Sequence, residues 1–320
     1  MMLLIFMADP SLEVSLSCSW WGRKAIVLWG LSVGGVSVVG MEIMQARENR
    51  DSYSEPSGKP SGKPSVKPSG KPSGKAVGQS FALISALTFF ATWGFEWIPI
   101  WKLPVSQFWW GIIYRSVIAV TWLLLMWALK PRMFKRLFVV RDPMRLLGGF
   151  GVVVFLILPQ LFHTPFRGHT PWQILEGFFF ALFIGIDEEL FSRGLIFGFL
   201  DKYGIKVAAV LSSIHFGALH LGNAIWGGQS FSYTAGQVLD AAAFGYLACG
   251  LMLFSGTIWM SILLHGLSDF PMQMVSRTQF THEVTGGFNW IGTLIDFAIY
   301  VVIGSMLMRA AKGKSLVSPS

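Results

Sequence analysis

The sequence predicts an all-α polytopic membrane protein in which about eight transmembrane helices surround an intramembrane polar cavity. Of the 320 residues, 53% are hydrophobic and only 13% are charged, about half the roughly 25% charge content of a soluble globular domain. The mean hydropathy is +0.55. The 27 phenylalanines and 14 tryptophans suit helix contacts and interfacial belts. These values exclude an ordinary cytosolic enzyme and a disordered chain.

Residues 1–55 precede the predicted helices and have no single interpretation. Residues 25–40 are apolar, but with 16 residues and four glycines they are short for a transmembrane helix. Arg23 and Lys24 stand before them, as in a signal anchor. Met41 or Met44 could equally be the true start, which would leave the first 40 residues outside the mature protein. The sequence therefore allows either a weak anchor or a mis-assigned start.

Residues 56–75 are five tetrapeptides of the form Pro-Ser-Gly-Lys, one of them with Val in place of Gly. Proline at every fourth position blocks helices and sheets, and almost nothing here can be buried, so a flexible tether is predicted. The tether holds five of the lysines behind the net charge of +8. We interpret the remaining basicity as membrane topology, with no nucleic-acid partner. The two cysteines form neither a disulfide framework nor a zinc-ligand cluster.

The membrane domain is predicted over residues 80–310, followed by a cytoplasmic tail over 311–320. Helices are expected throughout, because lipid offers no water to satisfy an exposed backbone. Eight stretches are long enough to span a bilayer, and they cover 80–101, 108–129, 144–162, 172–199, 207–225, 236–254, 257–275 and 290–308.

Basic residues in the loops predict the orientation of these helices. The loop 130–145 holds six of them, and the same side carries Lys202, Lys206 and three more in the tail. The opposite side carries Lys102, Arg167 and Arg277. The positive-inside rule therefore places both termini in the cytoplasm, and the style of the sequence indicates a bacterial inner membrane.

Ionisable side chains inside these spans are the first functional candidates, because such groups are costly in lipid. Measured along their helices, the central ones lie roughly 12 to 20 Å from the cytoplasmic ends. Polar groups of three helices thus fall in one layer, which a shared internal cavity would explain. They are Asp187, Glu188, Glu189 and Arg193 of the fourth span, His215 and His220 of the fifth, and His265 and Asp269 of the seventh.

Five other ionisable residues lie nearer the ends of spans or stand alone. For these we favour interface or packing roles. They are Glu96, Arg115, Glu176, Asp240 and Asp296.

Helical spacing assigns faces to the central candidates. Glu189 and Arg193 are four residues apart and can pair along one stripe. Glu188 is turned by about 100° from Glu189, so the two carboxylates need not share a role. His265 and Asp269 are again four residues apart and face one cavity together.

Three strings of residues carry a resemblance to a known family. The first is Glu188-Glu189-Leu190-Phe191-Ser192-Arg193, the second runs from Phe216 to His220, and the third runs from His265 to Asp269. In this order and on separate spans, they resemble the CAAX protease and bacteriocin-processing (Abi) family of intramembrane proteases, the type II CAAX prenyl endopeptidases among them. The resemblance covers roughly residues 172–275.

The resemblance implies hydrolysis of a peptide or membrane-protein substrate inside the bilayer. By position, Glu188 and His220 would activate a water, and His265 and Asp269 would stabilise the oxyanion. Glu189, Arg193 and Phe216 would support them. The chemistry is consistent with this, since amide hydrolysis needs a base, a water and an oxyanion donor. The site is expected to open toward the cytoplasmic half of the membrane.

Asp269 leaves the mechanism open, because an ionised carboxylate cannot donate a hydrogen bond to an oxyanion as the Asn of the family motif can. Asp269 could be protonated, could orient His265, or could bind a metal. Glu188, His220, His265 and Asp269 together would suit Zn²⁺, so a metalloprotease and a metal-free glutamate-dependent enzyme are both retained. His215 is five residues from His220 and is interpreted as a packing histidine.

Two other classes of protein remain as alternatives. One is a non-catalytic scaffold or bacteriocin-immunity protein with the same fold, which the intact motifs disfavour. The other is a proton-coupled transporter, but no span repeats the pattern of another and no inverted half-repeat is visible. The sequence does not name the substrate or say whether it is prenylated.

Overall fold

The computed structural model divides into two compact units, Met1–Pro68 and Ser69–Ser320. The structure describes the backbone of residues 12–21, 24–33 and 36–45, seven residues between 74 and 85, and then 106–225, 228–275, 284 and 288–311. The predicted tether over 56–75 lies outside the described residues apart from Gly74, and the predicted span over 80–101 lies outside them apart from three residues.

The described part of the first unit is a three-stranded antiparallel sheet in the order β1-β2-β3. The strands are β1 (Leu12–Trp21), β2 (Lys24–Val33) and β3 (Val36–Gln45). The apolar stretch 25–40 therefore forms parts of β2 and β3, where the sequence allowed an anchor helix. Apolar and polar residues alternate along β1, and valines and isoleucines recur in β2 and β3, which suits strands. The all-α prediction missed this sheet.

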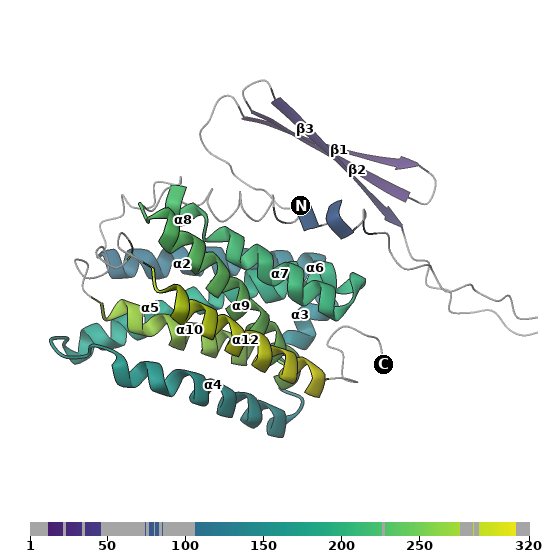
Figure 1. Ribbon diagram of the computed structural model, residues 1–320. Helices are drawn as coiled ribbons and strands as arrows, with labels where there is room; N and C mark the ends of the chain where they lie inside the picture. Colours follow the sequence, from purple (N-terminus) through teal and green to yellow (C-terminus); the bar gives the residue numbers. More distant parts are fainter. Residues whose placement is uncertain are drawn as a thin grey trace, which may run out of the picture. The chain divides into compact units, whose positions relative to one another are not determined.

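The described part of the second unit is helical, as predicted (Figure 1). Several helices begin where the sequence supplies a cap. Ser106, Asp142 and Ser230 each accept a backbone N–H of the first turn, and Thr170 forms a capping box with Gln173. The elements are α2 (Gln107–Leu129), α3 (Pro131–Leu137), α4 (Pro143–His163), α5 (Pro171–Glu189), the π-helix η3 (Leu190–Ile196), α6 (Phe197–Leu200), the 3₁₀ turn η4 (Asp201–Tyr203), α7 (Ile205–Leu219), α8 (Gly222–Ile225), α9 (Phe231–Ser255), α10 (Trp259–Gln273) and α12 (Trp290–Ala310).

Five of the described helical segments are long and apolar enough to cross a membrane. They correspond to five of the predicted spans, and the count of eight is not confirmed. Two further predicted spans coincide with α5–η3–α6 and with α10, the elements that carry most of the ionisable cluster. At 15 residues, α10 is shorter than the roughly 20 residues that a bilayer requires. The five segments are Phe108–Leu129, Pro143–His163, Ile205–Ile225, Phe231–Ser255 and Trp290–Ala310.

The outer surface of the second unit is apolar. Phe155 and Phe162 of α4 and Ile291 of α12 are each at least 70% exposed. Large exposed side chains of this kind would drive aggregation of a water-soluble monomer, but they suit the hydrocarbon of a bilayer. The described helices are therefore those of an integral membrane protein.

Close backbone contacts set the positions of the helices that carry the motifs. A Cβ atom added at Gly185 of α5 would lie 2.7 Å from the backbone nitrogen of Gly266 in α10. One added at Gly217 of α7 would lie 2.5 Å from the carbonyl oxygen of Val238 in α9. Small residues permit this approach in membrane helices. Because Gly185 is three residues before the first motif and Gly266 lies within the third, their contact brings those motifs together.

Candidate active site

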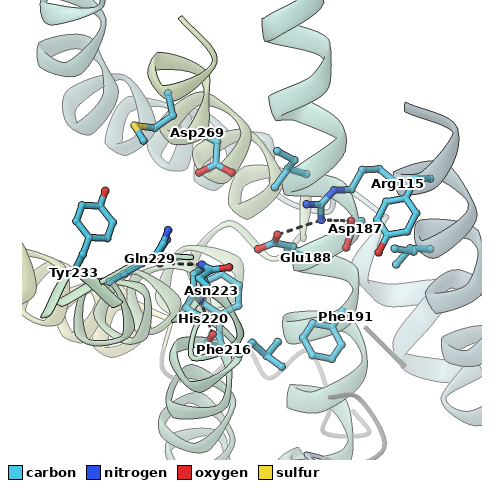
Figure 2. A pocket seen from close by; sticks show the side chains of 16 residues that line it. Arg115, Asp187, Glu188, Phe191, Phe216, His220, Asn223, Gln229, Tyr233 and Asp269 are labelled. Atoms are coloured by element: carbon cyan, nitrogen blue, oxygen red, sulfur yellow. Dashed lines mark hydrogen bonds and ion pairs between the residues drawn. The ribbon is translucent and has the colours of Figure 1, made fainter. Parts of the chain in front are cut away.

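A cavity of about 420 Å³ lies between the helices that carry the three motifs (Figure 2). Its walls come from α2, α5, η3, the end of α7, α8, the start of α9 and the end of α10. The lining residues are Tyr114, Arg115, Ile118, Ile184, Asp187, Glu188, Phe191, Phe216, Leu219, His220, Asn223, Gln229, Tyr233, Gln237, Asp269 and Met272.

The cavity lies near the end of the helical bundle at which α8 is found. The basic loop 130–145 follows the last residue of α2, at the opposite end of the bundle (Figure 1). Asn223 lies in α8, Gln229 lies just before α9, and Tyr233 lies in its first turn. The described lining residues therefore lie toward the end away from the basic loop. The expectation that the site opens toward the cytoplasmic half of the membrane stays a prediction.

The two glutamates of the first motif lie in different environments at the junction of α5 and η3. Glu188 lines the cavity and its side chain is 24% exposed, whereas Glu189 is fully buried. The helix changes to π geometry immediately afterwards, with the Phe197 N–H donating to the Ser192 carbonyl five residues earlier. Such π segments occur often at functional sites. The adjacent carboxylates thus lie in different environments, one on the cavity wall and one fully buried.

His265 connects the first and third motifs. Its Nδ1–H donates to Glu189 Oε1 over 2.8 Å, which fixes the orientation of the ring. Its Nε2 lies 3.6 Å from Glu188 Oε2 and 3.6 Å from Asp269 Oδ2. His265 is buried and is not among the lining residues of the cavity. Because Glu189 occupies Nδ1, Nε2 is the nitrogen through which His265 can act on the groups at the cavity.

The second carboxylate, Glu189, is also paired with Arg193 at 2.9 Å between Oε1 and Nη1. Both side chains are almost completely buried. The Arg193 guanidinium carbon lies 4.7 Å from the centre of the Phe216 ring, a cation–π contact. Phe216 in turn packs edge-on against the rings of His220 and His265. The structure thus brings these three predicted supporting residues together beneath the cavity.

His220 lies at the end of α7, where its Nδ1–H donates to the Phe216 carbonyl over 3.1 Å. A carbonyl only accepts, so in a neutral ring the proton is on Nδ1 and Nε2 is an acceptor. His220 and Asp269 both line the cavity with Glu188 (Figure 2). The structure therefore brings Glu188, His220 and Asp269 to one cavity, with His265 behind them.

Arg115 of α2 was expected to have an interface or packing role, and the structure places it on the cavity wall beside the first motif. Its Nη1 donates to Asp187 Oδ2 over 2.7 Å and to Glu188 Oε1 over 3.3 Å. A lone cation inside an apolar span was the signal that could have identified it. Pairing between α2 and α5 could not be read from the sequence, because 72 residues separate Arg115 from Asp187.

The other ionisable candidates lie apart from this cavity. His215 approaches the Ser85 carbonyl with Nε2 at 3.3 Å and packs against Phe81 and Phe191, as a packing histidine would. Glu176 lines a separate cavity of about 410 Å³. Asp240 and Asp296, of α9 and α12, are not among the lining residues of the active-site cavity. Glu96 lies outside the described residues.

The zinc alternative does not fit the arrangement of the predicted ligands. Among the residues that the structure describes, no three His, Cys, Asp or Glu side chains converge as metal ligands would. One oxygen of Glu188 faces the Arg115 guanidinium, and one nitrogen of His265 is taken by Glu189. A metalloprotease is therefore not supported by this donor set, and no step below passes through a metal.

The segment that contains all three motifs matches a known family. Residues 170–271 match the family model of Rce1-like type II CAAX prenyl endopeptidases. The resemblance carried by the motifs is thereby confirmed over about a third of the chain. The match covers α5 to most of α10, whereas Arg115 lies outside it. No curated protein and no solved structure matches the chain.

Glu189→Gln should reduce stability strongly, because it strands the Arg193 guanidinium in a dry environment. Breaking a buried pair costs about 3–5 kcal/mol, and the effect would be measured by thermal unfolding in detergent. The control is Asp142→Asn, which breaks the partly exposed Asp142–Arg145 pair but keeps an N-cap acceptor, so it should cost less than about 1 kcal/mol. Equal shifts in the two variants would contradict the buried pair's role.

Proposed function

We propose that this protein is an intramembrane endopeptidase that cleaves a peptide bond with a water activated by Glu188 and His220. The family match supports the reaction class. The observation that supports Glu188 as the catalytic glutamate is the different environment of the two adjacent carboxylates. Glu189 is held by Arg193 and His265, whereas Glu188 lies on the cavity wall. A purely structural scaffold would not need a carboxylate, two histidines and a cavity in one place.

Glu188 is the general base of this proposal. Its Oε1 faces Arg115, so Oε2 is the oxygen that remains for a proton. In the reaction, Glu188 accepts a proton from water while the water oxygen bonds to the substrate carbonyl carbon. The tetrahedral intermediate then collapses, the C–N bond breaks, and Glu188 returns the proton to the leaving amine. His220 orients the water through Nε2, because Nδ1 is fixed by the Phe216 carbonyl.

His265 and Asp269 stabilise the oxyanion in this proposal. The Nδ1–H bond to Glu189 leaves Nε2 of His265 for the reacting centre. Nε2 donates there when the ring carries both protons, as an imidazolium close to the carboxylates of Glu188, Glu189 and Asp269. Asp269 lies 3.6 Å from that nitrogen and acts beside it, either as a protonated donor or by orienting the ring. Donors aimed at a developing oxyanion are among the largest contributions to acyl-transfer catalysis.

Arg115 is a positioning residue for the base. Asp187 anchors the guanidinium at 2.7 Å, and the guanidinium then reaches one oxygen of Glu188. A carboxylate held at one oxygen presents the other in a fixed direction, which lowers the entropy cost of proton transfer.

Glu188→Gln should lower the cleavage rate by a hundredfold or more, because Gln has the same shape but cannot accept a proton. The substrates would be short peptides that end in a CAAX sequence, with and without a farnesyl group on the cysteine, incubated with purified protein and analysed by mass spectrometry. Glu176→Gln, in the separate cavity, is the control and should be as active as the wild type. Undiminished cleavage by Glu188→Gln would refute the base assignment.

Arg115→Met should lower kcat by about tenfold to a hundredfold with little change in KM, because the base is retained but no longer held. Arg115→Lys keeps the charge and should lose less. Arg132→Met, which removes an exposed basic residue of α3, should have no effect. A parallel fall in the unfolding temperature of Arg115→Met, with kcat intact in the folded fraction, would show that Arg115 serves stability alone.

Asp269→Asn should retain activity, because Asn can donate to the oxyanion in the same position, whereas Asp269→Ala should lose about a hundredfold. Metal content measured on the same samples separates the mechanisms. If Asp269 were a metal ligand, activity and bound metal would fall together in Asp269→Asn, and excess Zn²⁺ would partly restore both. That outcome would replace the donor or orienting role with a metal site.

A further inference from the structure

One wall of the cavity consists of uncharged polar side chains that no motif contains. Asn223 of α8, Gln229 before α9 and Tyr233 of α9 line the side away from Arg115 (Figure 2). Gln237 of α9 also lines the cavity and is hydrogen-bonded to Asn223. This wall therefore presents amide groups and a phenol to the cavity. The carboxyl and guanidinium groups among the described lining residues belong to Arg115, Asp187, Glu188 and Asp269.

Hydrogen bonds hold this wall in place. The Asn223 side-chain amide donates to Gln237 Oε1 over 2.9 Å, which joins α8 to α9. The Asn223 backbone N–H donates to the His220 carbonyl over 3.0 Å, so the wall continues directly from the histidine that orients the water. The Gln229 N–H donates to the Asn223 carbonyl, and Gln229 Oε1 accepts from the buried Thr234 hydroxyl over 3.3 Å. A wall fixed in advance loses little entropy when it binds a ligand.

The Asn223–Gln237 pair leaves one acceptor oxygen and one donor NH₂ group for the cavity. A primary amide has one oxygen with two lone pairs and one NH₂ group with two N–H donors, and the pair uses one N–H of Asn223 Nδ2 and the Gln237 oxygen. Asn223 Oδ1 and Gln237 Nε2 remain, and neither is hydrogen-bonded to another described residue. Exchanging the two ends of both amides would again leave one donor and one acceptor. This combination matches a peptide group, which has one N–H and one C=O.

The spacing along α9 places this pair close to the proposed reacting centre. Gln237 and Phe244 are seven residues apart on one stripe of the helix, a rise of about 10 Å, and the Phe244 ring contacts His265 with a centroid distance of 5.2 Å. An extended chain advances about 3.3 Å per residue. A substrate in extended conformation would therefore meet the pair about three residues from the bond that is cleaved.

We infer that Asn223 and Gln237 form a subsite that binds the main chain of the substrate through one peptide group, about three residues from the scissile bond. This inference deepens the proposed endopeptidase function and rests on it. A neutral amide pair provides affinity without reading a side chain, as main-chain recognition does along a sheet edge. Specificity at this position then depends on an extended backbone and not on the residue type.

The test is an ester scan of the unprenylated CAAX-type peptide, in which each peptide bond in turn is replaced by an ester that lacks the N–H. Binding is measured by fluorescence anisotropy with the full-length Glu188→Gln protein in detergent, so that no cleavage occurs. One ester position should raise Kd about fivefold, the loss expected for one hydrogen bond. In the Glu188→Gln/Asn223→Leu protein, the same ester should cause no further loss, because Asn223 Oδ1, the acceptor that would meet the substrate N–H, is gone.

Two further variants keep the test independent of misfolding. Gln237→Glu preserves the acceptor for Asn223 but removes the outward donor to the substrate C=O, so it should weaken binding of every peptide and leave the ester effect at Asn223 intact. Gln160→Met changes a glutamine of α4 outside the cavity and should leave the ester effect intact. A peptide that does not bind, an ester scan without any sensitive position, or equal ester effects with and without Asn223 would each overturn the subsite.

Failure of the subsite and failure of the proposed function give different results. Cleavage by the wild type with no sensitivity to Gln237 would leave the endopeptidase standing and remove the subsite. Gln237-dependent binding of a peptide that the wild type never cleaves would keep the subsite as a peptide-binding wall and remove the proposed hydrolysis.

Discussion

The hydrogen bond between His265 and Glu189 is the contact on which the site depends. It joins α10 to α5 over 2.8 Å inside the membrane domain, where no water competes for either group. The bond is possible because Gly185 and Gly266 let the two backbones approach to a distance at which any Cβ atom would clash. Glu189 is in turn neutralised by Arg193, so a buried charge does not stand alone.

The same arrangement explains how two adjacent carboxylates acquire different tasks. Arg193 and His265 hold Glu189 in a dry environment below the cavity, and Arg115 meets Glu188 on the cavity wall. Side chains of consecutive helical residues point about 100° apart. Here Glu188 meets Arg115 and Glu189 meets Arg193. The cations come from separate elements, η3 and α2, so the division requires the packed bundle and not the motif alone.

The residues of the three motifs could be predicted because their spacing is local. Four-residue intervals on a helix place Glu189 beside Arg193 and His265 beside Asp269 wherever the helix lies. Arg115, Asn223 and Gln237 carry no such local signal, since each contributes through a partner on another element. The sheet in the first unit was missed because a short apolar stretch with glycines was compared with a transmembrane helix and not with alternating strands.

The membrane class, the positions of most helices and the polar residues of the three motifs could be predicted from the sequence, because apolar length and helical spacing act over short distances along the chain. Only the tertiary structure decided which carboxylate faces the cavity, which end of the bundle the cavity reaches, and that Arg115 meets Glu188. Those outcomes depend on how helices far apart in the sequence approach one another, and glycine contacts such as Gly185 with Gly266 fix that approach at the level of single atoms.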